Sequence, residues 1–149
     1  MSTYLQVSGL SAREACVDAV LRFTQGLDDA SEELLDSALT DDFTLDATGV
    51  SVIGRPYHTL EGKATALPFF LDHVGAMDTC HMLSCFRVAL NGDEAKLTCY
   101  SLAQHHRNGE GSNIEKVGCL MGNRLTVDLR KITEGEWKMT RLVLKNAWL

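Results

Sequence analysis

The chain has 149 residues and a mass of 16.4 kDa, which is typical of one domain, and 45% of its residues are hydrophobic, enough for a packed core. It carries 14 lysine and arginine residues against 20 aspartate and glutamate residues, and this net charge of −6 argues against a nucleic-acid-binding surface. No apolar run approaches the roughly 20 residues of a membrane-spanning helix, and residues 1–10 lack the basic start and apolar stretch of a signal peptide. We therefore expect a single cytoplasmic domain, residues 1–149, without nucleic-acid or membrane partners.

Two helices are predicted near the start of the chain. Ser11 and Glu14 have the spacing of a capping box, in which each side chain accepts a hydrogen bond from the backbone of the other residue. Helical spacing then relates the apolar residues Cys16, Ala19, Val20, Phe23 and Leu27. Gly26 weakens this helix near its end, and residues 28–31 indicate a break. Ser31 is placed to cap a second short helix that carries Leu34, Leu35 and Ala38.

A strand and a third helix are expected next. Polar and apolar residues alternate strictly over 42–47, which predicts a half-buried strand. Residues 48–60 are rich in glycine and proline and are expected to form a loop with a short hairpin. A helix is expected over 61–73, kinked or starting late because Pro68 falls inside it. One face of this helix is formed by Ala64, Leu67, Leu71 and Val74.

The second half of the chain predicts a long sheet. Strands are expected over 79–90, 94–107, 117–133 and 136–146. Asn91-Gly92-Asp93 and Glu134-Gly135 are hairpin signals between them. Helices that precede an antiparallel sheet define an α+β fold. Because strands this long must twist or curl strongly, we expect a cone-shaped α+β barrel, with the helices on a curved mixed or antiparallel sheet that encloses an apolar pocket.

Several kinds of site are excluded by the spacing of residues. The five cysteines include no Cys-x-x-Cys pair and most have apolar neighbours, so we expect reduced core residues rather than disulfides or zinc ligands. Gly109-Glu110-Gly111 lacks the strand-to-helix context of a phosphate-binding loop. The adjacent His105 and His106 would point to opposite sides of a strand, and no carboxylate or thiolate spacing around His81 completes a metal site. We therefore expect no metal ion and no cofactor.

The alternation also assigns the histidines to faces of the sheet. On the strand over 94–107, the smaller and more apolar set of side chains includes His105, which should face the interior, whereas His106 should face outward. His81, on the preceding strand, shares a face with Leu83, Cys85 and Ala89. Asp28, at the end of the first helix, is the acidic candidate for pairing with a buried imidazole. Such a pair fixes the tautomer of the ring and leaves its other nitrogen for proton transfer.

A structural role for the same residues is the alternative. A single histidine on an apolar strand face is more often a hydrogen-bonded core residue than a catalyst. Asp28 could likewise cap a turn. The residue pattern alone leaves both interpretations open.

Short motifs recur in a characteristic order from about residue 12 to about residue 148. Each motif is weak by itself, whereas their order and spacing together are specific. The motifs are Asp28 after a helix, the strand Asp42-Phe43-Thr44-Leu45-Asp46, Glu61-Gly62-Lys63, Thr79-Cys80-His81-Met82-Leu83, Asn91-Gly92-Asp93-Glu94-Ala95, Ala103-Gln104-His105-His106 and Gly135-Glu136-Trp137-Lys138. In these motifs the chain resembles the SnoaL-like family of the nuclear-transport-factor-2-like superfamily, particularly its scytalone dehydratase-like branch.

The resemblance implies three catalytic residues in a deep apolar pocket. Carried over by position, His105 is the principal acid/base, Asp28 is its partner and His81 is a second, assisting imidazole. All three polar residues are present together in this chain. This retention favours an enzyme over a binding module, since a buried Asp–His pair carries a desolvation cost.

The substrate-binding positions depart from the family pattern. Scytalone dehydratases use two tyrosines that hold a water molecule against the substrate carbonyl, and the matching positions here are Leu27 and Ala47. Scytalone itself is therefore not the expected substrate. Tyr57 or His58 is the candidate for a replacement polar group, whereas Tyr100 has the wrong strand parity.

The expected function is a cofactor-free lyase or isomerase that acts on a hydrophobic small molecule. The resemblance implies dehydration, isomerisation or cyclisation of a polyketide or terpenoid intermediate. The alternative is a non-catalytic ligand-binding or oligomerisation module on the same fold. A homodimer or homotrimer is also expected, because apolar side chains are assigned to the face of the sheet opposite the pocket: Met82, Phe86, Val88, Tyr100 and Leu102.

Overall fold

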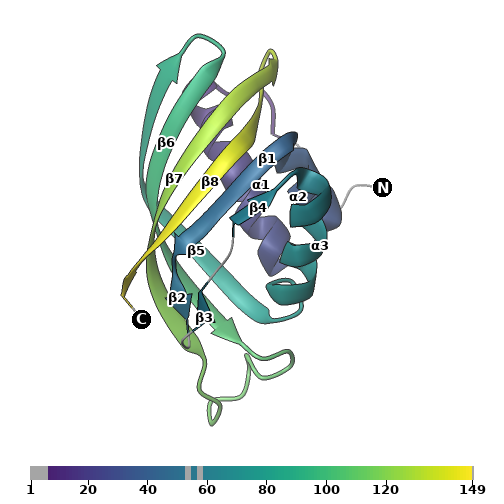
Figure 1. Cartoon of the computed structure of the whole chain (residues 1–149), viewed down its shortest axis with the longest axis vertical. Helices are drawn as coiled ribbons and strands as arrows, with labels where there is room; N and C mark the ends of the chain where they lie inside the picture. The colour runs from purple at the N-terminus through teal and green to yellow at the C-terminus, as the bar shows by residue number, and fades with distance from the viewer. Residues whose placement is uncertain (1–6, 53–54, 57–58, 149) are drawn as a thin grey trace.

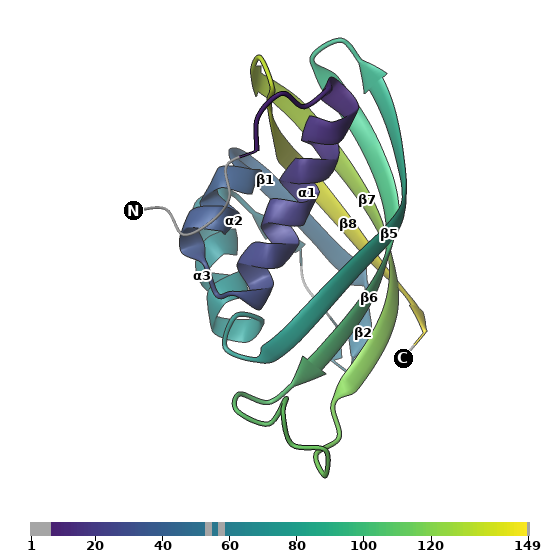
Figure 2. The ribbon, with the colours of Figure 1, turned by 180° about the vertical axis from the view of Figure 1, so that it is seen from behind.

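Three helices lie against one face of a strongly curved sheet (Figures 1 and 2). The structure is a computed structural model, which describes residues 7–52, 55–56 and 59–148. The helices are α1 (Ala12–Asp28), α2 (Glu32–Ala38) and α3 (Lys63–His73). In the described ranges no helix is both long and apolar enough to cross a membrane. The α+β fold expected from the sequence is confirmed.

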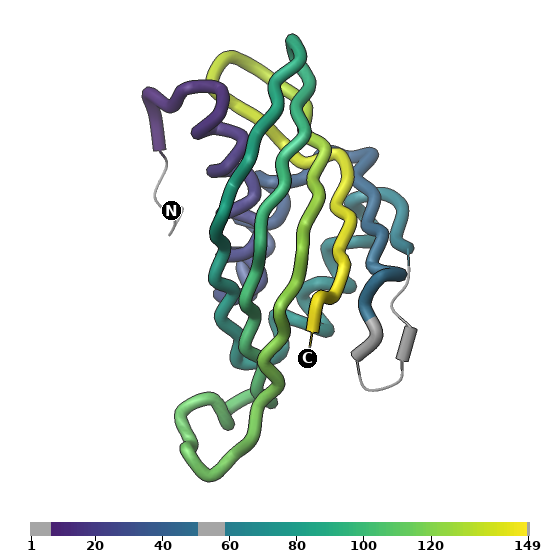
Figure 3. The backbone as a smooth tube through the Cα atoms, turned by 90° about the vertical axis from the view of Figure 1, so that its left-hand side faces the viewer, coloured from purple at the N-terminus to yellow at the C-terminus, as the bar shows by residue number. Residues whose placement is uncertain are grey.

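Six strands form the curved sheet, in the spatial order β4-β1-β8-β7-β6-β5. Their bounds are β1 (Leu39–Gly49), β4 (Thr59–Glu61), β5 (Asp78–Asn91), β6 (Glu94–His106), β7 (Cys119–Thr133) and β8 (Glu136–Trp148). β1 runs parallel to β8 and the other neighbouring pairs are antiparallel, so the sheet is mixed. Two short strands, β2 (Ser51–Val52) and β3 (Arg55–Pro56), pair antiparallel within residues 48–60, where the sequence predicts a loop with a short hairpin. The helices cover the inner face of the sheet and leave the outer face of β5–β8 uncovered (Figure 3).

The first two helices begin at the residues that the sequence indicates. The Ser11 side chain accepts a hydrogen bond from the backbone of Glu14, whose carboxylate accepts one from the backbone of Ser11. Ser31 caps α2 in the same way by accepting from Leu34. Gly26 does not end α1, which continues to Asp28. A Cβ atom at Gly26 would come within 2.8 Å of Cγ of Leu35, so this glycine allows the close approach of α1 and α2.

The third helix buries most of the expected face, with one exception. α3 contains Pro68 and is nevertheless one continuous helix from Lys63. Its buried residues are Ala66 and Phe70, and Ala64 is exposed, contrary to the expected face. Leu67, Leu71 and Val74 are half-buried and pack against the core.

The expected side-chain alternation on β5 is interrupted at Cys85. This residue has a φ of 58°, and the pairing of β5 with β6 shifts register between Ser84 and Arg87. A bulge of this kind inverts the two faces beyond it. Phe86 and Val88 therefore pack against the core, whereas Cys85 and Ala89 are exposed. The sequence-based assignment of these four residues to faces was wrong, and that of Met82, Tyr100 and Leu102 to the exposed outer face is confirmed.

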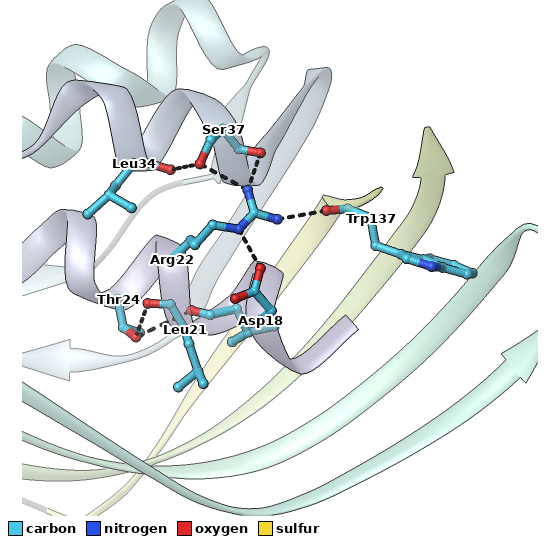
Figure 4. A network of polar contacts seen from close by, with 8 residues as sticks. Asp18, Leu21, Arg22, Thr24, Leu34, Ser37 and Trp137 are labelled. Carbon is cyan, nitrogen blue, oxygen red and sulfur yellow. Dashed lines mark hydrogen bonds and ion pairs between the residues drawn. The ribbon is translucent and has the colours of Figure 1, made fainter. Parts of the chain in front are cut away.

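Arg22 ties α1 to its neighbours (Figure 4). Its guanidinium group donates to Asp18 at 2.8 Å, to the backbone carbonyl of Ser37 at 2.6 Å and to that of Trp137 at 3.1 Å. These contacts join α1 to the end of α2 and the start of β8. They hold α1 along the inner face of the sheet, with its last residue, Asp28, beside β5.

Of the five cysteines, Cys16 and Cys99 are buried in the core. Cys80 and Cys85 are exposed and Cys119 is half-buried. The expectation of core cysteines thus holds for the first two and fails for the exposed pair, because Cys80 lies on the outer face and Cys85 lies at the bulge.

Candidate functional site

An apolar cavity lies between the helices and the inner face of the sheet. It contains about 740 Å³ of empty space, including the part that opens to solvent. Apolar side chains from α1, from α3 and the residue that follows it, and from four strands form most of its wall: Phe23, Leu27, Leu45, Ala47, Phe69, Phe70, Val74, Ala103, Met121, Leu125, Leu142 and Leu144. Its polar residues are Thr24, His81, Ser101, His105 and Asn123. The apolar pocket expected from the sequence is present.

A carboxylate and an imidazole form an ion-pair contact at one side of this cavity. Nδ1 of His81 lies 2.6 Å from Oδ1 of Asp28, and the backbone N–H of His81 donates to Oδ2 at 2.9 Å. The hydroxyl of Thr79 donates to Oδ1 at 2.8 Å. Because a carboxylate only accepts hydrogen bonds, Nδ1 of His81 carries the proton. In the neutral ring, Nε2 then holds a free lone pair, and His81 lines the cavity.

The surroundings of Asp28 keep its carboxylate ionised. Burial raises the pKa of Asp28 and is the largest single influence on it. The hydrogen bonds from the ring and backbone of His81, the charge of that ring and the hydroxyl of Thr79 together outweigh burial. The pKa therefore lies below its ordinary value of 3.8. Side-chain exposure is only 21% for Asp28 and 11% for His81, so the contact is largely shielded from water.

His105 lies edge-on to His81. Their ring centroids are 5.3 Å apart and the ring planes are inclined by 88°. Burial lowers the pKa of His105, and repulsion from the His81 ring in its protonated form lowers it further, while backbone carbonyls and Asp28 oppose this only in part. Nδ1 of His105 is buried and has no hydrogen-bond partner within the described part of the chain. The ring of His105 is therefore a neutral imidazole in contact with the cavity.

The pairing of Asp28 differs from the one implied by the family resemblance, which was with His105. The structure pairs Asp28 with His81 because β5 is the edge strand that runs beside α1, whereas β6 lies one strand further along the sheet. Thr79 and His81 alternate on one face of β5, so both reach the end of α1. That spacing is the signal in the sequence that indicates the observed pair.

The remaining residues that the sequence singled out differ in whether they reach the cavity. Leu27 and Ala47 line the cavity. Tyr57 and His58 lie outside the described residues. His106 is turned from the cavity, with its Nε2 atom 3.2 Å from Nε2 of Gln104, as strand alternation predicts.

Asn123, which sequence reasoning missed, provides a polar group on the wall formed by β7. The amide nitrogen of Asn146 donates to the backbone carbonyl of Trp148 at 3.0 Å and to Oδ1 of Asn123 at 3.1 Å. The carbonyl identifies the Asn146 atom as the donor nitrogen, so the Asn123 atom that faces it is the oxygen. Asn123 is thereby left with its amide NH₂ for a ligand. Strand alternation in β7 places Asn123 on the same inward face as Met121 and Leu125, and this pattern in the sequence could have identified it.

Known proteins resemble this chain in sequence and in fold. The SnoaL-like domain family matches residues 8–143. Terrestric acid biosynthesis cluster protein E from Penicillium crustosum is 33% identical over 141 residues, covering 93% of this chain and 85% of that protein. A candidate scytalone dehydratase from Novosphingobium aromaticivorans has 18% identity and a TM-score of 0.74, covering 91% of this chain and 83% of the other. Hexachlorocyclohexane dehydrochlorinase LinA-type3 from Novosphingobium barchaimii has 19% identity and a TM-score of 0.72, covering 92% of this chain and 87% of the other.

Proposed function

The chain belongs to the SnoaL-like domain family, and on this premise we propose that it is a lyase or isomerase that moves a proton on a hydrophobic small molecule. The observation that carries this proposal is the Asp28–His81 pair at the wall of an apolar cavity. Carboxylate-oriented imidazoles act as general bases near neutral pH. The reaction uses the side chains of this chain as acid and base, without a cofactor.

In the proposed reaction Nε2 of His81 removes a proton from a carbon next to a carbonyl group of the substrate. The C–H electron pair forms a C=C bond, and the carbonyl π electrons move to oxygen. The NH₂ group of Asn123 donates a hydrogen bond to that oxygen. Asp28 stabilises the imidazolium that forms, since its carboxylate already accepts from Nδ1.

The fate of the removed proton decides the reaction type. In a dehydration, the enolate collapses, the bond to a hydroxyl on the next carbon breaks, and His81 returns the proton to that hydroxyl, so one water molecule leaves. In an isomerisation, His81 returns the proton to another carbon. The neutral ring of His105, beside His81, is placed to hydrogen-bond the departing or migrating group.

The substrate class follows from the cavity wall and from the relatives. Among the described lining residues no lysine or arginine offers a counter-charge, which favours an uncharged substrate over a carboxylate or phosphate. The 33%-identical relative is named as a biosynthesis cluster protein of terrestric acid. We therefore propose an intermediate of secondary metabolism, of polyketide or terpenoid type, as the substrate.

The test uses neutral β-hydroxy ketones with hydrophobic substituents in D₂O. Nuclear magnetic resonance would follow deuterium uptake at the carbon next to the carbonyl, and mass spectrometry would follow loss of water. We expect His81→Gln to abolish both signals and His106→Gln, outside the cavity, to retain them. An unaltered rate in His81→Gln would refute the proposed base. Saturable binding of these ketones without exchange or water loss would instead identify a ligand-binding module.

A further inference from the structure

Thr79 contacts the Asp28–His81 pair without lining the cavity. Its hydroxyl donates to Oδ1 of Asp28, the same oxygen that accepts from the His81 ring. The backbone N–H of His81 holds the other oxygen. Two donors of β5, besides the imidazole, therefore fix the position and rotation of this carboxylate.

The fixed position matters because a second imidazole, that of His105, lies beside the Asp28–His81 pair. His105 stands perpendicular to His81, with ring centroids 5.3 Å apart. The charge of Asp28 already acts on the ring of His105. Nδ1 of His105 is buried and lacks a partner among the described residues, so it could donate to a carboxylate that turned toward it. Nothing in the rings themselves selects one partner, since both are histidines.

We propose that Thr79 is a positioning residue that locks the carboxylate of Asp28 onto His81 and so determines which of the two histidines is the base. The catalytic consequence rests on the proposed function, whereas the choice of partner is a property of the resting protein. Without the hydroxyl, Oδ1 loses one of its two donors, so only His81 still holds the carboxylate, which can then turn toward His105 more easily. His81 then no longer keeps its proton on Nδ1 exclusively.

The test measures the histidine tautomers directly, in protein labelled with ¹⁵N. Long-range ¹H–¹⁵N correlation spectra distinguish a proton on Nδ1 from a proton on Nε2 in each ring. We expect the Nδ1–H form of His81 in the unaltered protein and in Thr79→Ser, which keeps the hydroxyl. In Thr79→Val, the Nε2–H form of His81 should appear and the nitrogen shifts of His105 should change. Thr98→Val, on the exposed outer face of β6, is the matched control and should alter neither ring.

The outcomes separate this proposal from the proposed function. An unchanged His81 tautomer in Thr79→Val, with or without a lower melting temperature, would show that Thr79 has only a structural role. Thr79→Ala provides the same test if the valine variant does not fold. With a substrate in hand, kcat should fall about 10- to 100-fold in Thr79→Val, with KM unchanged and activity rescued in Thr79→Ser. If His81→Gln remains active while the tautomer result stands, the proposed function fails and the positioning role of Thr79 survives.

Discussion

Asp28 and His81 are joined at two points, one through a side chain and one through the backbone. Oδ1 of Asp28 lies 2.6 Å from Nδ1 of His81, and Oδ2 accepts from the backbone N–H of the same residue at 2.9 Å. The end of α1 is thereby attached to the edge strand β5. The same carboxylate therefore attaches the two elements and orients an imidazole that lines the cavity.

Asp28→Asn should inactivate the protein while leaving it folded. An amide NH₂ group facing Nδ1 of His81 would donate to that nitrogen, which places the ring proton on Nε2 and removes the lone pair that faces the substrate. We expect a loss of about 10²- to 10⁴-fold in kcat, the usual contribution of a general base. Asp29→Asn is the matched control, because Asp29 contacts only Gln25 among the described side chains. Equal activity in both variants would contradict the role of Asp28.

The stability of the protein should decrease as the pH falls below about 6.5, the ordinary pKa of histidine. Burial lowers the pKa of His105 in the folded state, so between the folded and unfolded pKa values the unfolded chain binds more protons. The contribution of His105 to stability is therefore fully present above the pKa that this residue has in the unfolded chain. It is lost as the pH falls toward the lower pKa of the folded state. The lowered pKa values of the aspartates affect the stability of the protein only below about pH 4.

His105→Gln isolates this effect. The melting temperature of the unaltered protein and of the variant would be measured from about pH 7.5 to about pH 5. The variant should lose a smaller part of its stability over this range, because glutamine does not titrate. Parallel curves would show that His105 is not buried as a neutral ring.

Gly26→Ala should destabilise the fold, although the same exchange inside a helix ordinarily stabilises it by about 0.5–1 kcal/mol. The added Cβ atom would lie 2.8 Å from Cγ of Leu35 and 3.0 Å from its backbone nitrogen, so α2 must shift. Overpacking of this kind costs about 1–3 kcal/mol. Denaturant unfolding measures the change in the free energy of unfolding, and a gain in stability would show that the two helices separate without cost.

Local signals in the sequence predict most of the fold. Ser11 and Ser31 mark the two helix starts, and the polar–apolar alternation in β1 and β6 places each side chain on the observed face. The sequence-based predictions fail where contacts between residues far apart in the chain determine the local conformation. The bulge at Cys85 places a positive φ at a residue that is neither glycine nor asparagine, so no residue type in the local sequence predicts it.

The sequence pointed to three polar residues that the structure brings together, but not to their pairing and not to Asn123. His81 and His105 line the cavity, Asp28 contacts His81, and alternation correctly separates His105 from His106. The partner of Asp28 depends on which strand borders α1, and this is a property of strand order in the sheet. Family resemblance placed the carboxylate on His105, whereas the position of β5 beside α1 brings His81 within its reach.

A row of exposed apolar side chains crosses the outer face of the sheet, which the helices leave uncovered. Met82 pairs with Leu102, Leu102 with Gly122 and Gly122 with Trp148, so one row spans β5, β6, β7 and β8. The indole of Trp148 occupies the space above Gly122 that a Cβ atom would need. Exposure is 50% for Met82, 43% for Leu102 and 47% for Trp148. Phe86 and Val88, which were expected on this face, pack in the core instead.

From this apolar row we predict a homodimer or homotrimer whose interface buries the row. Leu102→Glu would place a charge in the centre of the row, where burial without a partner is costly, and should yield monomers. Thr98→Glu, exposed on the same strand and the same face but outside the row, should leave assembly intact. Sedimentation equilibrium at micromolar concentration measures the mass of each. A particle of 16.4 kDa for the unaltered protein would contradict the prediction, and so would a Leu102→Glu variant that assembles as the unaltered chain does.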